Sequence, residues 1–148
     1  MPTGTTAARG AAVAWIAFIA LLAVLPFGTV SAREPVVWVA IVPFDTIGHA
    51  LARGLTAATF VSIVGNVAAF LPIGLLAPLG WDRWRSWPAA VALGVGVSLA
   101  IEASQLAISI AVGIPYRRAD VDDVILNGLG TAIGYAAWLG LRVRGRRS

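Results

Sequence analysis

The sequence predicts an all-α integral membrane protein with four transmembrane helices, and three observations support this fold class. Hydrophobic residues make up 59% of the 148 residues and charged residues only 12%, whereas a soluble domain is about half apolar and about a quarter charged. The apolar residues form four long runs, and a spanning helix needs about 20 such residues. Most charged residues stand at the ends of these runs or between them. We therefore expect a multi-pass membrane protein embedded in a lipid bilayer.

The four runs predict spans over residues 11–30, 62–79, 88–112 and 124–142, all within a single membrane domain that covers residues 1–148. Between the first two spans, the piece VVWVAIVPF at residues 36–44 is apolar but too short to cross a bilayer. We expect it to belong to an interfacial or re-entrant segment, and a broken fifth span is the less favoured alternative.

The first apolar run has two interpretations. Arg9, the hydrophobic stretch that follows it and the VSA sequence at residues 30–32 together are typical of a secretory signal with its cleavage site. The stretch is long for such a signal, which favours a retained membrane helix. Both interpretations stay open at this point.

The arginines predict the topology, because cytoplasmic ends of membrane spans carry an excess of basic residues. All eleven basic residues are Arg. An N-in, C-in arrangement leaves Arg33, Arg53, Arg117 and Arg118 outside, and it places seven inside: Arg9, Arg83, Arg85, Arg142, Arg144, Arg146 and Arg147. We therefore predict that both termini face the cytoplasm.

Composition also argues against several function classes. The net charge is +4, but the arginines flank apolar runs and anionic lipid accounts for them, so we expect no nucleic-acid partner. The chain has no Cys and a single His, His49, which argues against disulfides, thiolate catalysis and zinc sites. We predict no cofactor and no dedicated metal site.

The third span carries a polar stripe. Ser98, Glu102, Gln105 and Ser109 are spaced by four, three and four residues, so they share one helix face. An ionisable residue inside a membrane is by default a functional candidate. Glu102 therefore either contributes to a site or holds helices together, as buried polar groups also do.

The fourth span presents another polar face. Asp120, Asp123 and Asn127 follow one another at helical spacing, and Gly130 and Gly134 continue that face as a GxxxG pair suited to close helix packing. An aspartate at the start of the span is expected to cap the helix, with Asp120 or Asp122 in that role. We expect Asp122 to point away from this face, toward the outer water.

The predicted topology brings the polar residues of three spans into the same outer half of the membrane. We predict a ligand-binding site there, with carboxylates and arginines that suit an amine, a phosphate or a hard cation. Its candidate residues are Asn66, Glu102, Gln105, Arg117, Asp120, Asp123 and Asn127.

Four sequence motifs carry a resemblance to a known family. In order along the chain they are VPFDTI at 42–47, GNVAAFLPIGLLAPL at 65–79, SLAIEASQ at 98–105 and RRADVDDVILNGLGTAIGY at 117–135. On these motifs the chain is identified as a member of the VanZ-like membrane proteins. The resemblance implies a multi-pass protein of the bacterial cell membrane, related to envelope factors that raise resistance to teicoplanin-type glycopeptides.

The resemblance and the polar residues together favour a non-enzymatic protein that binds an amphiphilic or lipid-linked ligand, such as a lipid-linked cell-wall precursor or a lipoglycopeptide. Three alternatives stay open. One is a metal-dependent enzyme that acts on a lipid phosphate through Glu102, Asp120 and Asp123. Another is a small transporter, which four short spans would permit only as a homo-oligomer. The last is a structural partner of a larger complex.

Overall fold

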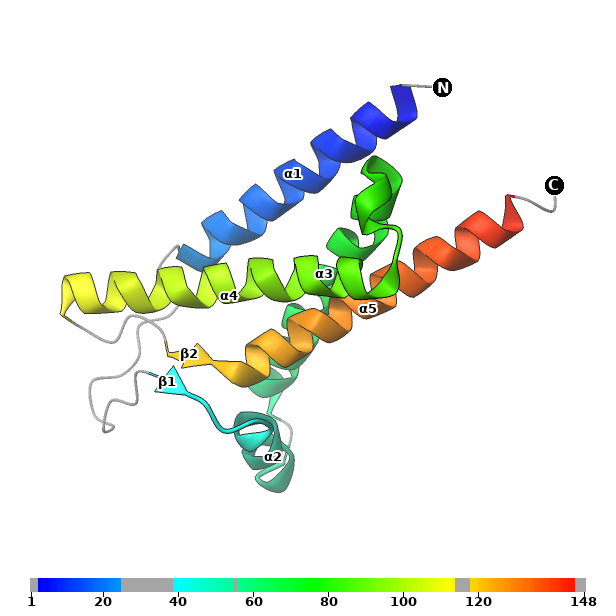
Figure 1. Cartoon of the computed structure of the whole chain (residues 1–148). Coiled ribbons are helices and arrows are strands. Elements are labelled where there is room, and N and C mark those ends of the chain that lie inside the picture. Colours follow the sequence, from blue (N-terminus) through cyan, green and yellow to red (C-terminus); the bar gives the residue numbers. More distant parts are fainter. Residues whose placement is uncertain (1–2, 25–38, 55, 114–117, 146–148) are drawn as a thin grey trace.

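A computed structural model of the chain describes residues 3–24, 39–54, 56–113 and 118–145. In this part of the chain the elements follow one another as α1 (Thr3–Val24), β1 (Val39–Ala40), α2 (Asp45–Ala52), α3 (Ala57–Gly80), the 3-10 turn η1 (Asp82–Trp84), α4 (Trp87–Val112), β2 (Ala119–Asp120) and α5 (Val121–Arg144). Figure 1 shows the long helices crossing one another, with α2 and the two strands at the end of the bundle away from the chain termini.

The helices α1, α3, α4 and α5 are each long and apolar enough to cross a membrane, which confirms the predicted all-α membrane fold with four spans. The observed helices are longer than the predicted spans. For example, α1 begins at Thr3 and not at residue 11, and α5 begins at Val121 and not at 124. The predictions counted only apolar residues, whereas helices extend through polar first turns. Residues 25–30 of the first predicted span lie outside the described residues.

The connection between α1 and α3 contains a strand and a short helix. The strand β1 pairs in parallel with β2, with Val39 opposite Ala119 and Ala40 opposite Asp120. After β1, Ile41, Val42 and Phe44 are exposed within four residues of one another, and neighbouring exposed apolar side chains are typical of a surface that contacts lipid or another protein. This agrees with the predicted interfacial segment, of which residues 31–38 lie outside the described part.

Glycines set the distance between α3 and α5. A Cβ atom on Gly130 would overlap the carbonyl oxygen of Val67, and one on Gly134 would overlap that of Leu71. On α3, a Cβ atom on Gly74 would overlap the carbonyl oxygen of Thr131. The two helix backbones therefore touch, as the GxxxG pair predicts. This close packing fixes the position of the first turns of α5 relative to α3.

Helix α1 packs against α3 through specific contacts. The Arg9 Nε atom donates to the carbonyl oxygen of Gly80 at 2.7 Å, and the Trp15 indole N–H donates to that of Ala69 at 2.7 Å. One turn after Trp15, Ile19 is buried against Phe70 and Ile73. These contacts favour the interpretation of the first apolar run as a retained membrane helix.

The start of α1, the α3–α4 connection and the end of α5 lie at one end of the bundle (Figure 1), and arginines there contact tryptophan rings. The guanidinium group of Arg83 stacks over the Trp84 ring at 4.7 Å, and that of Arg142 over the Trp138 ring at 5.3 Å. Aromatic belts and basic residues are typical of a membrane interface. The arrangement is the one that an N-in, C-in topology requires, and the side of the membrane that this end faces stays a prediction.

Candidate functional site

The polar stripe predicted on the third span lies buried along α4. Ser98 and Ser109 are fully buried, and Glu102 and Gln105 are also buried. The Gln105 amide donates to the carbonyl oxygen of Ala23 at 3.0 Å, which joins α4 to the end of α1. The stripe therefore faces the other helices and not the lipid.

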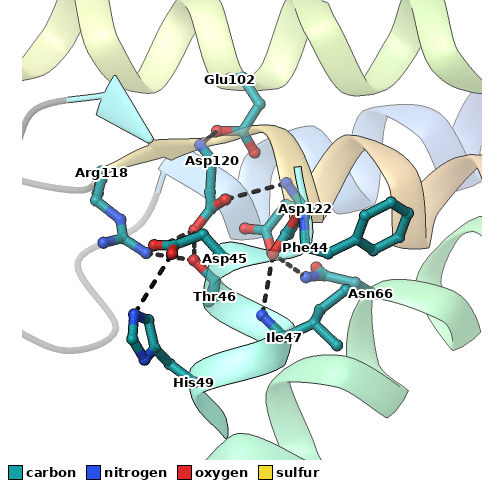
Figure 2. Close-up of polar contacts among 11 residues, drawn as sticks. Phe44, Asp45, Thr46, Ile47, His49, Asn66, Glu102, Arg118, Asp120 and Asp122 are labelled. Atoms are coloured by element: carbon teal, nitrogen blue, oxygen red, sulfur yellow. Dashed lines mark hydrogen bonds and ion pairs between the residues drawn. The ribbon is translucent and has the colours of Figure 1, made fainter. Parts of the chain in front are cut away.

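Glu102 reaches from α4 to the segment that precedes α5, as Figure 2 shows. Its Oε2 atom accepts a hydrogen bond from the backbone N–H of Asp120 at 2.9 Å. Asp120 in turn caps α5, because its Oδ1 atom accepts from the backbone N–H of Asp122 at 3.0 Å. This confirms the capping role predicted for Asp120.

The other oxygen of Asp120 is the centre of a polar cluster. The Arg118 guanidinium group and the Thr46 hydroxyl both donate to Oδ2, each at 2.7 Å, and Arg118 also donates to the Thr46 hydroxyl at 2.7 Å (Figure 2). The Asp120 acceptor is buried and the Arg118 side chain is partly exposed, and charge-assisted hydrogen bonds of this kind are stronger than those between neutral groups. We call Thr46, Glu102, Arg118, Asp120 and Asp122 the Asp120–Asp122 network.

Asp122 caps the helix α2 from another part of the chain. Its carboxylate oxygens accept the backbone N–H groups of Phe44 at 2.5 Å and Ile47 at 3.0 Å. Phe44 stands at the N-cap position of α2 with a left-handed backbone, φ 65°, and no side-chain cap of its own. A carboxylate stabilises the positive end of a helix, so Asp122 replaces the missing local cap and holds this strained residue in place.

The prediction that Asp122 faces the outer water is wrong, because its side chain is only 1% exposed. The prediction treated the helix α5 alone and left out the polypeptide that covers it. The N–H groups that Asp122 binds belong to residues 75 and 78 positions earlier in the chain. Phe44 and Ile47 belong to the VPFDTI motif, which was the only sequence feature that drew attention to this segment.

The hydrogen-bond partners described below for Asp123 and Asn127 do not belong to the Asp120–Asp122 network. The Asn66 amide of α3 donates to the Asp123 carboxylate at 2.6 Å. The Asn127 Nδ2 atom donates to the Ser98 hydroxyl of α4 at 2.8 Å. The Oδ1 atom of Asn127 is buried and has no hydrogen-bond partner, although a buried polar atom without a partner costs about 1–3 kcal/mol.

These side chains border a cavity of about 470 Å³ between α1, α3, α4 and α5, which we call the four-helix cavity. This volume lies in the range of small-molecule sites, about 300–1,000 Å³. Its polar lining residues are Asn66, Glu102, Gln105, Asp123 and Asn127, and its apolar lining includes Ile19, Leu22, Val61, Phe70 and Ile101. Five of the seven predicted site residues thus line one cavity.

The two remaining predicted site residues lie elsewhere. Asp120 belongs to the Asp120–Asp122 network, and Arg117 lies outside the described residues. The neighbouring Arg118 lines a second cavity of about 670 Å³, together with Arg53 and His49. The structure therefore places Arg118 in a different cavity from the five residues above, and the predicted contribution of Arg117 stays a prediction.

The carboxylates of this region already hold protein groups. Glu102 and Asp120 accept the hydrogen bonds given above, and Asp123 accepts from Asn66. In the described parts of the chain, no three His, Asp or Glu side chains form a group that could hold a metal ion. Within the described residues, these carboxylates act as hydrogen-bond acceptors that join α2, α3, α4 and α5.

The fold and this cluster define the class: a multi-pass α-helical membrane protein with buried carboxylates at one end of its helix bundle. Within that class, the chain belongs to the VanZ/LLP1 family, whose model matches residues 10–142. This confirms the family resemblance seen in the sequence motifs. Comparison with curated proteins and with solved structures found no match.

Proposed function

We propose that this protein is a non-enzymatic factor of the bacterial cell membrane that binds an amphiphilic or lipid-linked ligand in the four-helix cavity. The observation that carries the proposal is the composition of the cavity wall. Amides and carboxylates stand on one part of it, and Ile19, Phe70 and Ile101 stand on another. A ligand with a polar head and a hydrocarbon part satisfies both kinds of wall.

The rim of the cavity supports entry from the bilayer. Leu22 and Val61 line the cavity and are also exposed on the outside of the bundle. In a membrane these apolar side chains contact lipid, so a hydrocarbon chain can pass from lipid into the cavity without crossing water. The topology that we predict from the arginines puts this end of the bundle in the outer leaflet, in keeping with the proposal.

The hydrogen bonds favour binding over turnover. A metal-dependent mechanism would need Glu102, Asp120 and Asp123 to direct oxygen atoms at one ion. Two of them belong to the Asp120–Asp122 network, where they hold backbone and side-chain donors, and Asp123 points to Asn66. A lipid-linked cell-wall precursor and a lipoglycopeptide both have the amphiphilic character that the cavity matches, and the family resemblance supports a role in teicoplanin-type resistance.

Antibiotic susceptibility tests the proposal. We would express the wild type, Asp123→Ala and Asp82→Asn at equal membrane levels in a glycopeptide-sensitive bacterium. Asp82 is an exposed carboxylate at the opposite end of the bundle, so its variant is a matched control. We expect the wild type and the control to raise the inhibitory concentration of teicoplanin more than that of an unlipidated glycopeptide, and Asp123→Ala to lose the increase.

Two results would count against the proposal in different ways. If Asp123→Ala protects as well as the wild type, the four-helix cavity is not the site that matters. If the wild type itself gives no protection, the resistance role fails, and direct binding of a fluorescent alkyl-chain ligand to the purified protein then decides whether the cavity binds amphiphiles at all.

A further inference from the structure

The start of α1, the α3–α4 connection and the end of α5, which lie together in Figure 1, carry a large excess of positive charge. In the described part of the chain, the charged residues there are one carboxylate, Asp82, and five arginines: Arg9, Arg83, Arg85, Arg142 and Arg144. Asp82 pairs with Arg85 at 2.7 Å. Among the described residues, the other four arginines have no carboxylate within ion-pair distance, so this end of the protein attracts anions.

Two of these arginines converge on one tryptophan of the α3–α4 connection. The Cζ atom of Arg9, from α1, lies 5.7 Å from the centre of the Trp81 ring, and that of Arg83, from η1, lies 6.0 Å from it. An aromatic ring attracts a guanidinium group but leaves its charge in place. Two like charges at one ring repel each other, and an anion bound to both would remove this repulsion.

Arg9 is held in position by the end of α3. Its Nε atom donates to the carbonyl oxygen of Gly80 at 2.7 Å, and the last carbonyl groups of a helix carry partial negative charge. A Cβ atom on Gly80 would lie 3.0 Å from the Arg9 Cγ atom, so the absence of a side chain permits this contact. The terminal nitrogen atoms of Arg9 have no acceptor among the described residues, and the planar guanidinium group matches the oxygen atoms of a phosphate.

The surroundings of these arginines indicate a lipid and not a soluble anion. Leu79 and Trp87 stand on either side of the connection, and their side chains are 42% and 49% exposed. Both belong to helices that are long and apolar enough to cross a membrane, so these side chains contact lipid at this end of the spans. A ligand that presents an anionic group to Arg9 and Arg83 therefore has hydrocarbon beside it.

We propose that Arg9 and Arg83 bind the phosphate group of one anionic phospholipid at the Trp81 ring. An anionic head group such as phosphatidylglycerol brings only negative charge, whereas a zwitterionic one brings an ammonium group that the remaining arginines repel. The bound lipid joins α1 to the α3–α4 connection. None of these three residues lines the four-helix cavity, and the site does not depend on the proposed function.

Lipid binding to the full chain in uncharged detergent micelles tests the inference. The probes are phosphatidylglycerol and phosphatidylcholine with identical acyl chains, together with inorganic phosphate. Native mass spectrometry counts the retained lipids, and thermal unfolding measures their effect on stability. We expect one phosphatidylglycerol to be retained at least about tenfold more tightly than phosphatidylcholine, because only the former adds no cation to the site. Bound phosphatidylglycerol should also raise the unfolding midpoint.

Variants locate the site. Arg9→Gln and Arg83→Gln should each reduce phosphatidylglycerol affinity about tenfold through loss of one charged hydrogen-bond donor. Arg83→Lys keeps the charge and loses the planar group, so its affinity should lie between those of the wild type and Arg83→Gln. Arg144→Gln, at the end of α5, is the matched control and should leave the affinity nearly unchanged. Thermal unfolding without lipid shows whether each variant is folded, and the exposed Arg83 decides the test if Arg9→Gln is not.

Each other outcome overturns the inference in a recognisable way. Equal losses in Arg9→Gln, Arg83→Gln and Arg144→Gln would show a diffuse attraction to anionic membranes without a site. Equal retention of the two lipids would remove the requirement for an anionic head group. Displacement of phosphatidylglycerol by an equal concentration of inorganic phosphate would make this a site for the free ion. No retained phosphatidylglycerol would remove the lipid site, and the proposal for the four-helix cavity would be unaffected.

Discussion

The Asp120–Asp122 network and the four-helix cavity are neighbouring polar regions built from the first turns of the same helix, yet they differ in how their polar atoms are used. In the network, Asp120 and Asp122 accept hydrogen bonds from α2, from α5 and from Arg118. In the cavity, the Asn127 oxygen has no partner and a volume of about 470 Å³ lies beside it. Pairing of the described carboxylates with protein donors is what a structural role requires, whereas the unpaired acceptor beside open volume is the feature on which the proposed binding site depends.

The adjacent residues Asp122 and Asp123 show how the difference arises. Successive residues of an α-helix point in directions about 100° apart, so one carboxylate meets the backbone of α2 and the other meets Asn66 on α3. Identical chemistry one residue apart thus serves two purposes. The direction of each side chain therefore determines which part of the protein its carboxylate contacts.

The largest expected effect is one that destroys both regions together. Gly134→Ala places a methyl group against the Leu71 carbonyl oxygen, so α3 and α5 must separate. We expect a loss of about 3 kcal/mol or more in the free energy of unfolding, typical of severe overpacking, measured by denaturant titration in micelles. Gly140→Ala is the matched control, because a Cβ atom there meets nothing within 4 Å; equal stability of the two variants would contradict the close packing.

A smaller loss of stability is expected from a substitution that affects the Asp120–Asp122 network and leaves the four-helix cavity intact. Asp122→Ala removes the acceptor of the Phe44 and Ile47 N–H groups, and we expect a loss of about 2 kcal/mol together with faster hydrogen exchange in α2. Water can reach the exposed Phe44, which limits the cost. Asp45→Ala changes an exposed carboxylate of the same helix and should cost under about 0.5 kcal/mol. Unchanged exchange at Ile47 in Asp122→Ala would show that α2 does not depend on this cap.

The smallest stability effect is expected in the cavity. Asn127→Leu keeps the size of the side chain, and it removes a buried oxygen that has no partner along with the hydrogen bond to Ser98. These changes oppose each other, so unfolding should shift by no more than about 1 kcal/mol, while amphiphile binding is lost. A large destabilisation with unchanged binding would assign Asn127 to the structural region instead.

Local patterns in the sequence were sufficient to predict much of this molecule. The four spans follow from run length, the buried stripe around Glu102 from helical spacing, and the contact of Gly130 and Gly134 with α3 from the GxxxG pattern. Each of these features depends on residues within one helix. The predicted residues on three helices also converge on one cavity, because the polar residues of each helix lie near the same end of the bundle.

Features that join distant segments were not predictable in this way. The pairing of β1 with β2 involves two residues in each strand, too short to leave an alternating pattern. The burial of Asp122 depends on Phe44 and Ile47, which no spacing within α5 reveals. The separation of Arg118 from the cavity depends on its contact with Thr46, 72 positions earlier.

The most direct test of the central claim compares Asp122→Asn with Asp123→Asn, the same substitution at adjacent positions. For each variant, the thermal unfolding midpoint and the affinity for a fluorescent alkyl-chain ligand would be measured on folded protein in uncharged micelles. We predict that Asp122→Asn lowers the midpoint more than Asp123→Asn does and keeps the affinity, whereas Asp123→Asn loses about tenfold in affinity. If the two variants lose stability and affinity in equal measure, the network and the cavity are one structural cluster and the division between them is wrong.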